Sequence, residues 1–147
     1  TGEIKRMEVA GKNGIKINDN WKKQIETYGG LHVNGFPNMF ITVGPQSPSV
    51  LGNMIFNGEA HIKKIAEIIE YMKINGYETV ENTKEAEEEW MKLCEQVSGT
   101  FEMSNARNWY NKGNITRTVG QSMPFEGGNF LYIEEMLKRS PKALKFS

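Results

Sequence analysis

The chain has 147 residues, enough for one domain with a hydrophobic core, and its 18 basic residues balance 18 acidic ones. The zero net charge gives no basic excess for nucleic acid or an anionic membrane, and no apolar run approaches the roughly 20 residues of a membrane span. The single cysteine, Cys94, excludes an internal disulfide and fits a reducing compartment, so we expect a cytoplasmic location.

The first quarter of the chain predicts short elements. Imperfect alternation of apolar residues on either side of a polar Gly-Lys-Asn-Gly stretch predicts a hairpin over residues 3–17. Residues 18–23 are expected to form one helical turn, and residues 31–36 to be extended. We expect Trp21 and Tyr28 to pack against the main body of the protein rather than to bind a ligand.

Residues 35–54 are the most informative stretch. Residues 39–43 are an apolar run broken only by Thr42, which predicts a strand covered on both faces, as in a parallel sheet. A helix is predicted to begin at Asn53, whose side chain caps its first N–H groups. Such a strand–loop–helix unit often holds an anionic or carbonyl-rich ligand, although the pattern alone favours an ordinary connection. Without neighbouring strands, we expect marginal stability and an exposed apolar surface.

The helix predicted over residues 53–74 ends at a C-cap signal, Asn75-Gly76, and Gly58 inside it costs about 1 kcal/mol relative to Ala. A short strand is expected at residues 77–80. The apolar side chains that the helix should bury share one face, which Ile68 widens: Ile62, Ile65, Ala66, Ile69 and Met72.

A second helix is predicted to run to about Val97, with Asn82 as its cap in a capping-box sequence. The acidic run at residues 85–89 is interpreted as a solvated face near the helix N-terminus, because no His or Asp accompanies it to form a metal site. A third helix is expected from about Phe130, closed by Ser140-Pro141. Between these helices, residues 101–125 are rich in Asn, Gly and aromatic residues, which predicts an ordered functional loop.

Hydrolase and zinc chemistry find little support. The chain contains no Gly-x-Ser-x-Gly motif, and neither His32 nor His61 stands in a nucleophile or zinc-binding pattern. We expect His61, on the first long helix, to be a surface or helix-packing residue.

Five motifs follow one another along the chain. Together they resemble the C-terminal part of the Baeyer–Villiger monooxygenases, in family order and at family spacing, from Thr1 to about Tyr132. The matching segments are Trp21 with Thr27-Tyr28-Gly29, Gly35-Phe36-Pro37-Asn38-x-Phe40, Gly44-Pro45-Gln46-Ser47-Pro48, Asn108-Trp109-Tyr110 with Gly113-Asn114, and Met123-Pro124-Phe125-x-Gly127-Gly128.

The resemblance implies an α/β fold: the C-terminal segment of a flavoprotein with two dinucleotide-binding domains, mainly helical, with a few short strands that complete the FAD-binding region over residues 1–147. No Gly-x-Gly-x-x-Gly fingerprint is present, so the FAD and NADP fingerprints are expected in the remaining regions of a parent enzyme. The implied activity is an FAD- and NADPH-dependent monooxygenation that uses O2 to convert ketones to esters or lactones. The family's catalytic Arg lies upstream, so this segment alone is expected to be inactive.

The resemblance also assigns site residues. The helix N-terminus would stabilise negative charge on the reduced flavin, and Trp109 would face the nicotinamide cofactor from a loop, with anchoring of the loop as the alternative. The residues expected to bind cofactor are Gln46, Asn53, Met54, Trp109 and Asn114. Those expected to line the substrate pocket are Ser49, Val50, Leu51 and Met123. No catalytic or metal-binding residue is assigned within the chain.

One departure from the family follows Asn114. The usual Pro-Gly-Lys is missing, with Thr118 at the position of the Lys and Arg117 beside it. Two further functions stay open: a flavin monooxygenase that oxidises nitrogen or sulfur, and a non-catalytic binding module derived from a monooxygenase.

Overall fold

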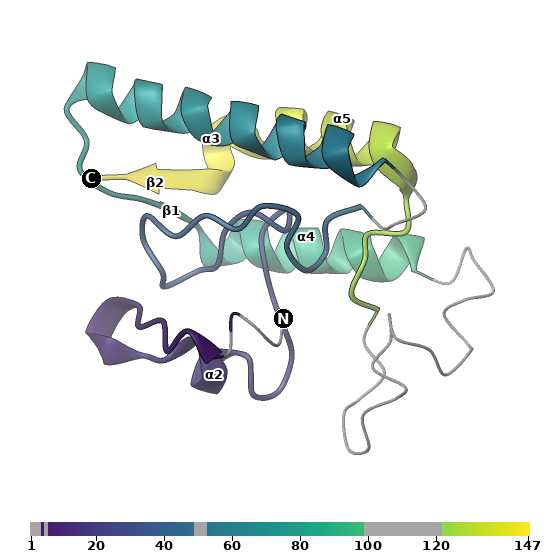
Figure 1. Cartoon of the computed structure of the whole chain (residues 1–147), viewed down its shortest axis with the longest axis horizontal. Helices are drawn as coiled ribbons and strands as arrows, with labels where there is room; N and C mark the ends of the chain where they lie inside the picture. Colours follow the sequence, from purple (N-terminus) through teal and green to yellow (C-terminus); the bar gives the residue numbers. More distant parts are fainter. Residues whose placement is uncertain (1–3, 5, 49–52, 99–121) are drawn as a thin grey trace.

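The computed structural model describes residues 4, 6–48, 53–98 and 122–147. Three long helices dominate this part of the chain: α3 (Met54–Asn75), α4 (Lys84–Val97) and α5 (Gly128–Ala143). In Figure 1 the long coil of residues 21–48, which follows α2 (Ile17–Asn20), lies below α3 and α5 and overlaps α4 in this view. No helix among the described residues is long and apolar enough to cross a membrane.

Two short strands form the only sheet in the described part of the chain. β1 (Val80–Asn82) and β2 (Leu144–Phe146) are antiparallel, with Val80 opposite Phe146. The strand predicted at residues 77–80 therefore begins later, and its partner β2 was not predicted. A segment of three residues carries too little periodicity to reveal a strand.

The predicted ends of α3 are confirmed, but its predicted buried face is only partly correct. The Asn53 side chain accepts hydrogen bonds from the backbone N–H groups of the first turn, and Gly76 ends the helix with a φ of 70°. The fully buried residues of α3 are Asn57, His61 and Ile68. Ile62 and Ile69 are 60% and 51% exposed, so much of the predicted apolar face is not covered by the described residues.

The start of α4 corrects two expectations. The cap is Thr83, whose hydroxyl accepts from the backbone N–H of Ala86, while Asn82 belongs to β1. Within the acidic run, Glu87 is buried rather than solvated. Its carboxylate accepts from the backbone N–H of Asn34 at 2.8 Å and from Lys84 Nζ at 3.2 Å. A buried carboxylate needs such partners, so Glu87 fastens the coil to α4.

The third helix is longer than predicted. α5 passes through Ser140-Pro141 and ends at Ala143. Proline removes one backbone donor, and here that loss does not stop the helix, which leads directly into β2.

The predicted strand at residues 39–43 is wrong for this structure. The segment is coil and turn, and no strand within the described residues pairs with it. The backbone N–H of Ile41 donates to the carbonyl of Leu31 at 2.8 Å, a contact with coil rather than with a sheet. The predicted hairpin is likewise reduced to one antiparallel bridge, between Ala10 and Lys16, around the turn η1 (Lys12–Gly14).

The core confirms that Trp21 and Tyr28 pack internally, each with 2% of its surface exposed. Tyr28 belongs to a cluster between the coil, α4 and α5, in which Trp90 stacks on Phe125 with ring centroids 5.3 Å apart. Trp21 belongs to a second cluster nearer the N-terminus. Aromatic packing therefore joins the N-terminal coil to the helices.

Candidate functional site

The loop that precedes α3 is anchored by the segment that precedes α5. The backbone N–H of Gln46 donates to the carbonyl of Met123 at 2.6 Å, and that of Phe125 donates to the carbonyl of Ser47 at 2.7 Å. Pro48 and Phe125 form a parallel bridge. Two motifs almost eighty positions apart in the sequence therefore meet at one place, close to the N-terminus of α3.

The same loop has a strained backbone. Val43 and Gln46 have φ angles of 51° and 61°, a region that residues other than glycine seldom adopt and that the β-branched Val43 adopts more rarely still. The Thr27 hydroxyl oxygen lies 2.8 Å from the carbonyl of Pro45 and 2.9 Å from Gln46 Oε1, and the Gln46 amide donates to the carbonyl of Ile25. These bonds hold the loop in its conformation.

Gln46, predicted to bind cofactor, is therefore a buried residue with its carboxamide turned to its own chain. This geometry makes it a residue that positions the loop. A direct contact with cofactor stays a prediction.

The N-terminus of α3 is accessible. Asn53 Oδ1 accepts from the N–H groups of Ile55 at 3.0 Å and Phe56 at 3.3 Å, and residues 53–56 are exposed, Met54 by 48%. The first turn of a 22-residue helix carries partial positive charge, which favours a carbonyl or anionic group close to that end of the helix. The roles predicted for Asn53 and Met54 are compatible with this geometry and stay predictions.

The other predicted site residues divide into two groups. Met123 is half-buried against the N-terminal cluster, and its carbonyl accepts from the loop residue Gln46. The loop predicted at residues 101–125 lies outside the described residues as far as residue 121. So do the remaining predicted site residues: Ser49, Val50, Leu51, Trp109 and Asn114.

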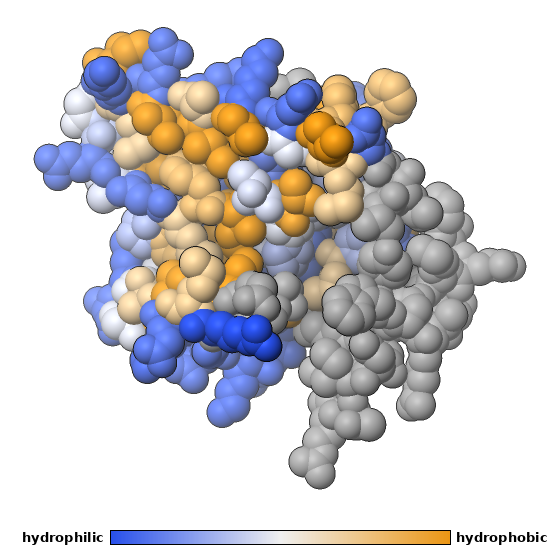
Figure 2. Space-filling view, in the orientation of Figure 1, coloured by the Kyte–Doolittle hydropathy of each residue, from blue (hydrophilic) through white to orange (hydrophobic). Residues whose placement is uncertain are grey.

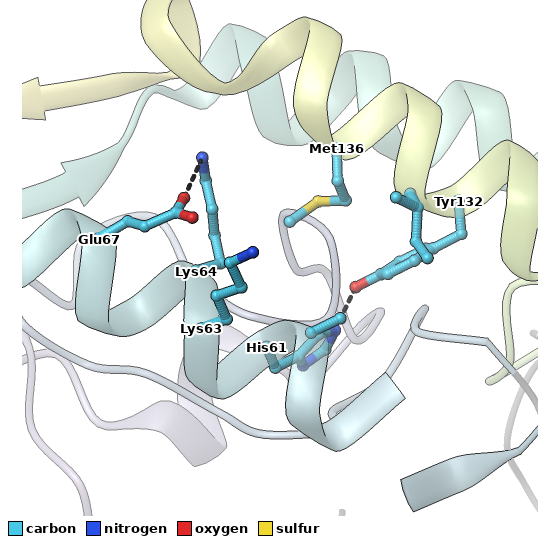
Figure 3. A pocket seen from close by; sticks show the side chains of 8 residues that line it. His61, Lys63, Lys64, Glu67, Tyr132 and Met136 are labelled. Atoms are coloured by element: carbon cyan, nitrogen blue, oxygen red, sulfur yellow. Dashed lines mark hydrogen bonds and ion pairs between the residues drawn. The ribbon is translucent and has the colours of Figure 1, made fainter. Parts of the chain in front are cut away.

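A buried hydrogen-bonded pair, His61 on α3 and Tyr132 on α5, stabilises the start of the loop (Figure 3). His61 Nδ1 accepts from the backbone N–H of Val43 at 3.0 Å. The ring proton of the neutral imidazole is therefore on Nε2, which donates to the Tyr132 hydroxyl, and that hydroxyl donates to the carbonyl of Gly29. The pair connects two helices to two separate turns of the coil.

Burial keeps this pair neutral. It lowers the pKa of His61 to about 4 and raises the pKa of Tyr132 above its usual value. Burial likewise lowers the pKa of His32 to about 4, with smaller contributions from the nearby His61 and Lys64. The helix-packing interpretation of His61 is thus confirmed, and the surface alternative is wrong.

A pocket of about 210 Å³ lies beside the pair, between α3 and α5 (Figure 3). Ile133 and Met136 give it an apolar wall, and Lys64, paired with Glu67 at 3.6 Å, lies at its edge. The described residues contain no cluster of three or more His, Cys, Asp or Glu side chains arranged to hold a metal. No motif in the sequence indicated this pocket, because its two walls come from helices more than fifty residues apart.

Comparisons with known proteins place this geometry in a class. The chain is 36% identical over 114 residues to the cyclohexanone 1,2-monooxygenase of an Acinetobacter species, an alignment that covers 78% of this chain and 21% of that protein. It is 28% identical over 127 residues to a phenazine N-monooxygenase of Lysobacter antibioticus, covering 86% of this chain and 23% of that protein. No protein-family model matches.

The comparison with solved structures agrees with the comparison of sequences. The crystal structure of cyclohexanone monooxygenase from Rhodococcus sp. Phi1 bound to NADP+ superposes with a TM-score of 0.90 at 27% identity, over 99% of this chain and 28% of that one. The chain therefore has the fold of one segment of a flavin monooxygenase. More narrowly, it is a portion of a Baeyer–Villiger monooxygenase of the cyclohexanone monooxygenase-like group. The chain spans about a quarter of the length of the relatives it matches.

Proposed function

We propose that this chain forms the wall of a flavin and ketone site in an FAD monooxygenase that uses NADPH and O2 to make esters or lactones. The observation that supports it best is the anchored loop: residues 44–48, held by residues 123–125, lead to an exposed helix N-terminus. The relatives named cyclohexanone monooxygenase share this segment in sequence and fold.

The residues present fit such a cofactor. The partial positive charge at the start of α3 would favour the electron-rich carbonyl edge of a flavin ring, with Asn53 and Met54 beside it. FAD would supply the redox chemistry, while this chain orients it. Gln46 keeps the loop in place, and the proposed substrate-lining residues follow that loop or adjoin it: Ser49, Val50, Leu51 and Met123.

NADPH would be contacted by Trp109 and Asn114, a role that the family resemblance implies for them. The two dinucleotide-binding regions and the catalytic Arg would come from the remaining polypeptide. In this reaction the chain would supply no acid, base or nucleophile, and its contribution would be binding, orientation and exclusion of water.

Nitrogen oxidation is the second candidate, because the phenazine N-monooxygenase relative aligns with 86% of this chain. A non-catalytic binding module is the third. All three share the same scaffold, so substrate chemistry rather than fold separates them.

A segment exchange tests the proposal. The matching segment of the Acinetobacter cyclohexanone 1,2-monooxygenase is replaced by this chain, and the chimera is assayed for bound FAD, NADPH oxidation and products from cyclohexanone, a sulfide and phenazine. The parent enzyme is the control.

We expect bound FAD and a lactone from cyclohexanone. N-oxide or sulfoxide without lactone would favour the second candidate. A folded chimera that gives no oxygenated product would favour the binding module.

A further inference from the structure

The pocket between α3 and α5 takes no part in the proposed function. Of the proposed cofactor and substrate residues that the structure describes, none lines it. Figure 3 shows Lys63, Lys64 and Glu67 of α3 on one side of the pocket, and Met136 and Tyr132 of α5 on the other. A cavity between two packed helices is a common place for a small molecule to bind.

The inner end of the pocket has no hydrogen left to donate. The most buried side chains of the lining are His61 and Tyr132, each 2% exposed. His61 Nε2 donates to the Tyr132 hydroxyl, which donates to the carbonyl of Gly29, so both protons are already used. A carboxylate placed here would lose its water without gaining a donor. This end therefore suits an apolar group, as do the walls formed by Ile133 and Met136.

The outer rim of the pocket carries a surplus positive charge. Lys63 is exposed and pairs with no carboxylate among the residues that the structure describes. Lys64 and Glu67 form an ion pair at 3.6 Å, so two lysines face one glutamate at the rim. The surplus charge favours an anionic head group, and a carboxylate held at the rim also keeps its contact with water.

The volume of the pocket limits the length of an apolar tail. Its 210 Å³ or so exceeds the roughly 150 Å³ of an apolar cavity that holds benzene. A flexible chain of about six to eight carbons therefore fits. Each methylene that leaves water for the apolar walls strengthens binding, so a shorter acid should bind more weakly.

We infer that this pocket binds a monocarboxylate with an aliphatic chain of about six to eight carbons. The tail lies against Ile133 and Met136, and the carboxylate meets Lys63 at the rim. The tail ends at the His61–Tyr132 pair. The inference stands on the pocket alone and does not depend on the proposed reaction.

Apolar surface elsewhere on α3 supplies a matched control. Figure 2 shows apolar side chains gathered over this helix. Ile62 is 60% exposed and is separated by about 160° around the helix from Ala60 and Lys64, which line the pocket. Ala60→Leu should therefore fill the pocket, whereas Ile62→Gln should reduce the exposed apolar surface and leave the pocket unchanged.

The first experiment titrates octanoate into the 147-residue chain, below the concentration at which octanoate forms micelles. The methionine methyl groups carry ¹³C and are followed by NMR. The Met136 methyl signal should shift and saturate, while that of Met91, buried on α4 outside the pocket, should stay in place. Octanoate should bind up to about fifteenfold more tightly than hexanoate, because it buries two more methylenes.

The variants test the pocket and its rim separately. Ala60→Leu should weaken octanoate binding by at least roughly tenfold, because the new side chain takes the place of the tail. Ile62→Gln should bind octanoate like the original chain. Lys63→Gln should weaken binding by about two- to fivefold, while Lys92→Gln, an exposed lysine of α4, should not change it. Urea unfolding followed by tryptophan fluorescence checks that each variant is folded.

Three results would overturn the inference. One is the absence of a saturable shift at Met136, or equal shifts at Met136 and Met91. The second is octanoate binding that survives Ala60→Leu but falls in Ile62→Gln, because the exposed surface would then be the site. The third is equal affinity for hexanoate and octanoate, or no effect of Lys63→Gln, because tail length and head-group charge would then not matter.

The same titration in the chimera with the Acinetobacter enzyme tests the pocket within a longer chain, and it decides the question if the 147-residue chain or a variant does not fold. Octanoate should bind the chimera with a similar dissociation constant, and Ala60→Leu should again weaken it. A folded chimera that does not bind octanoate would overturn the inference.

Discussion

Lowering the pH from 7 to 5 should destabilise this chain through its two buried histidines. The pKa of each falls from 6.5 to about 4 in the folded state, chiefly because of burial. Between these values the unfolded chain binds protons that the folded chain does not, so stability is fully present above pH 6.5 and is lost as pH falls toward 4. At His61, a proton on Nδ1 would also displace the N–H of Val43.

The size of the effect follows from the two pKa values. For one histidine with pKa 6.5 unfolded and about 4 folded, the free energy of unfolding falls by roughly 2 kcal/mol between pH 7 and pH 5. The two histidines together should therefore lower it by about 4 kcal/mol. Above pH 5 most exposed carboxylates keep their charge in both states, so the histidines dominate the change.

Urea unfolding followed by tryptophan fluorescence at several pH values from 8 to 5 measures this loss, since Trp21 and Trp90 are both buried. His61→Gln is the matched variant, because its side-chain oxygen can accept the Val43 N–H without titrating. It should retain about half of the pH dependence. A free energy of unfolding that is flat between pH 7 and pH 5, or an unchanged slope in His61→Gln, would refute the reasoning.

Three further predictions concern single residues. Gly58→Ala should stabilise the chain by up to about 1 kcal/mol in urea unfolding, because the new Cβ would meet Val43 at 3.7 Å, an ordinary contact; destabilisation would show that the space is not there. Glu87→Ala should cost about 1–3 kcal/mol by leaving the Asn34 N–H without its acceptor, whereas Glu87→Gln should cost less. In the chimera, Trp109→Ala should lower NADPH-dependent oxygenation by about 1–3 kcal/mol in the catalytic step; a lower melting temperature with unchanged turnover would make Trp109 a packing residue.

Local signals in the sequence were sufficient to predict those parts of the fold that depend on residues close together in the chain. Asn53 and Gly76 define the ends of α3, because a side-chain cap and a left-handed glycine act within one helical turn. The burial of Trp21 and Tyr28 followed from their size in polar surroundings. The motifs from Trp21 to Gly128 also indicated the family, which sequence and fold comparisons confirm.

The sequence did not determine which side of an element is covered, because that depends on what lies opposite it. Ile62 and Ile69 have the periodicity of a buried face, yet they are exposed. Of the predicted apolar face, Ile68 is covered by the sheet strands, and α5 covers His61, which lay outside that face. Residues 39–43 have the composition of a buried strand, but a strand exists only where another pairs with it. The capping role of Thr83 instead of Asn82 was decided in the same way, by the pairing of β1 with β2.

The sequence by itself determined the family, the presence of the three long helices and the two ends of α3, since these follow from short-range periodicity, capping and ordered motifs. Only the tertiary structure brought Gln46 to Met123, and His61 to Tyr132, because each pair joins residues more than seventy positions apart. Such contacts form when the helices pack, and no local preference of either residue specifies its partner.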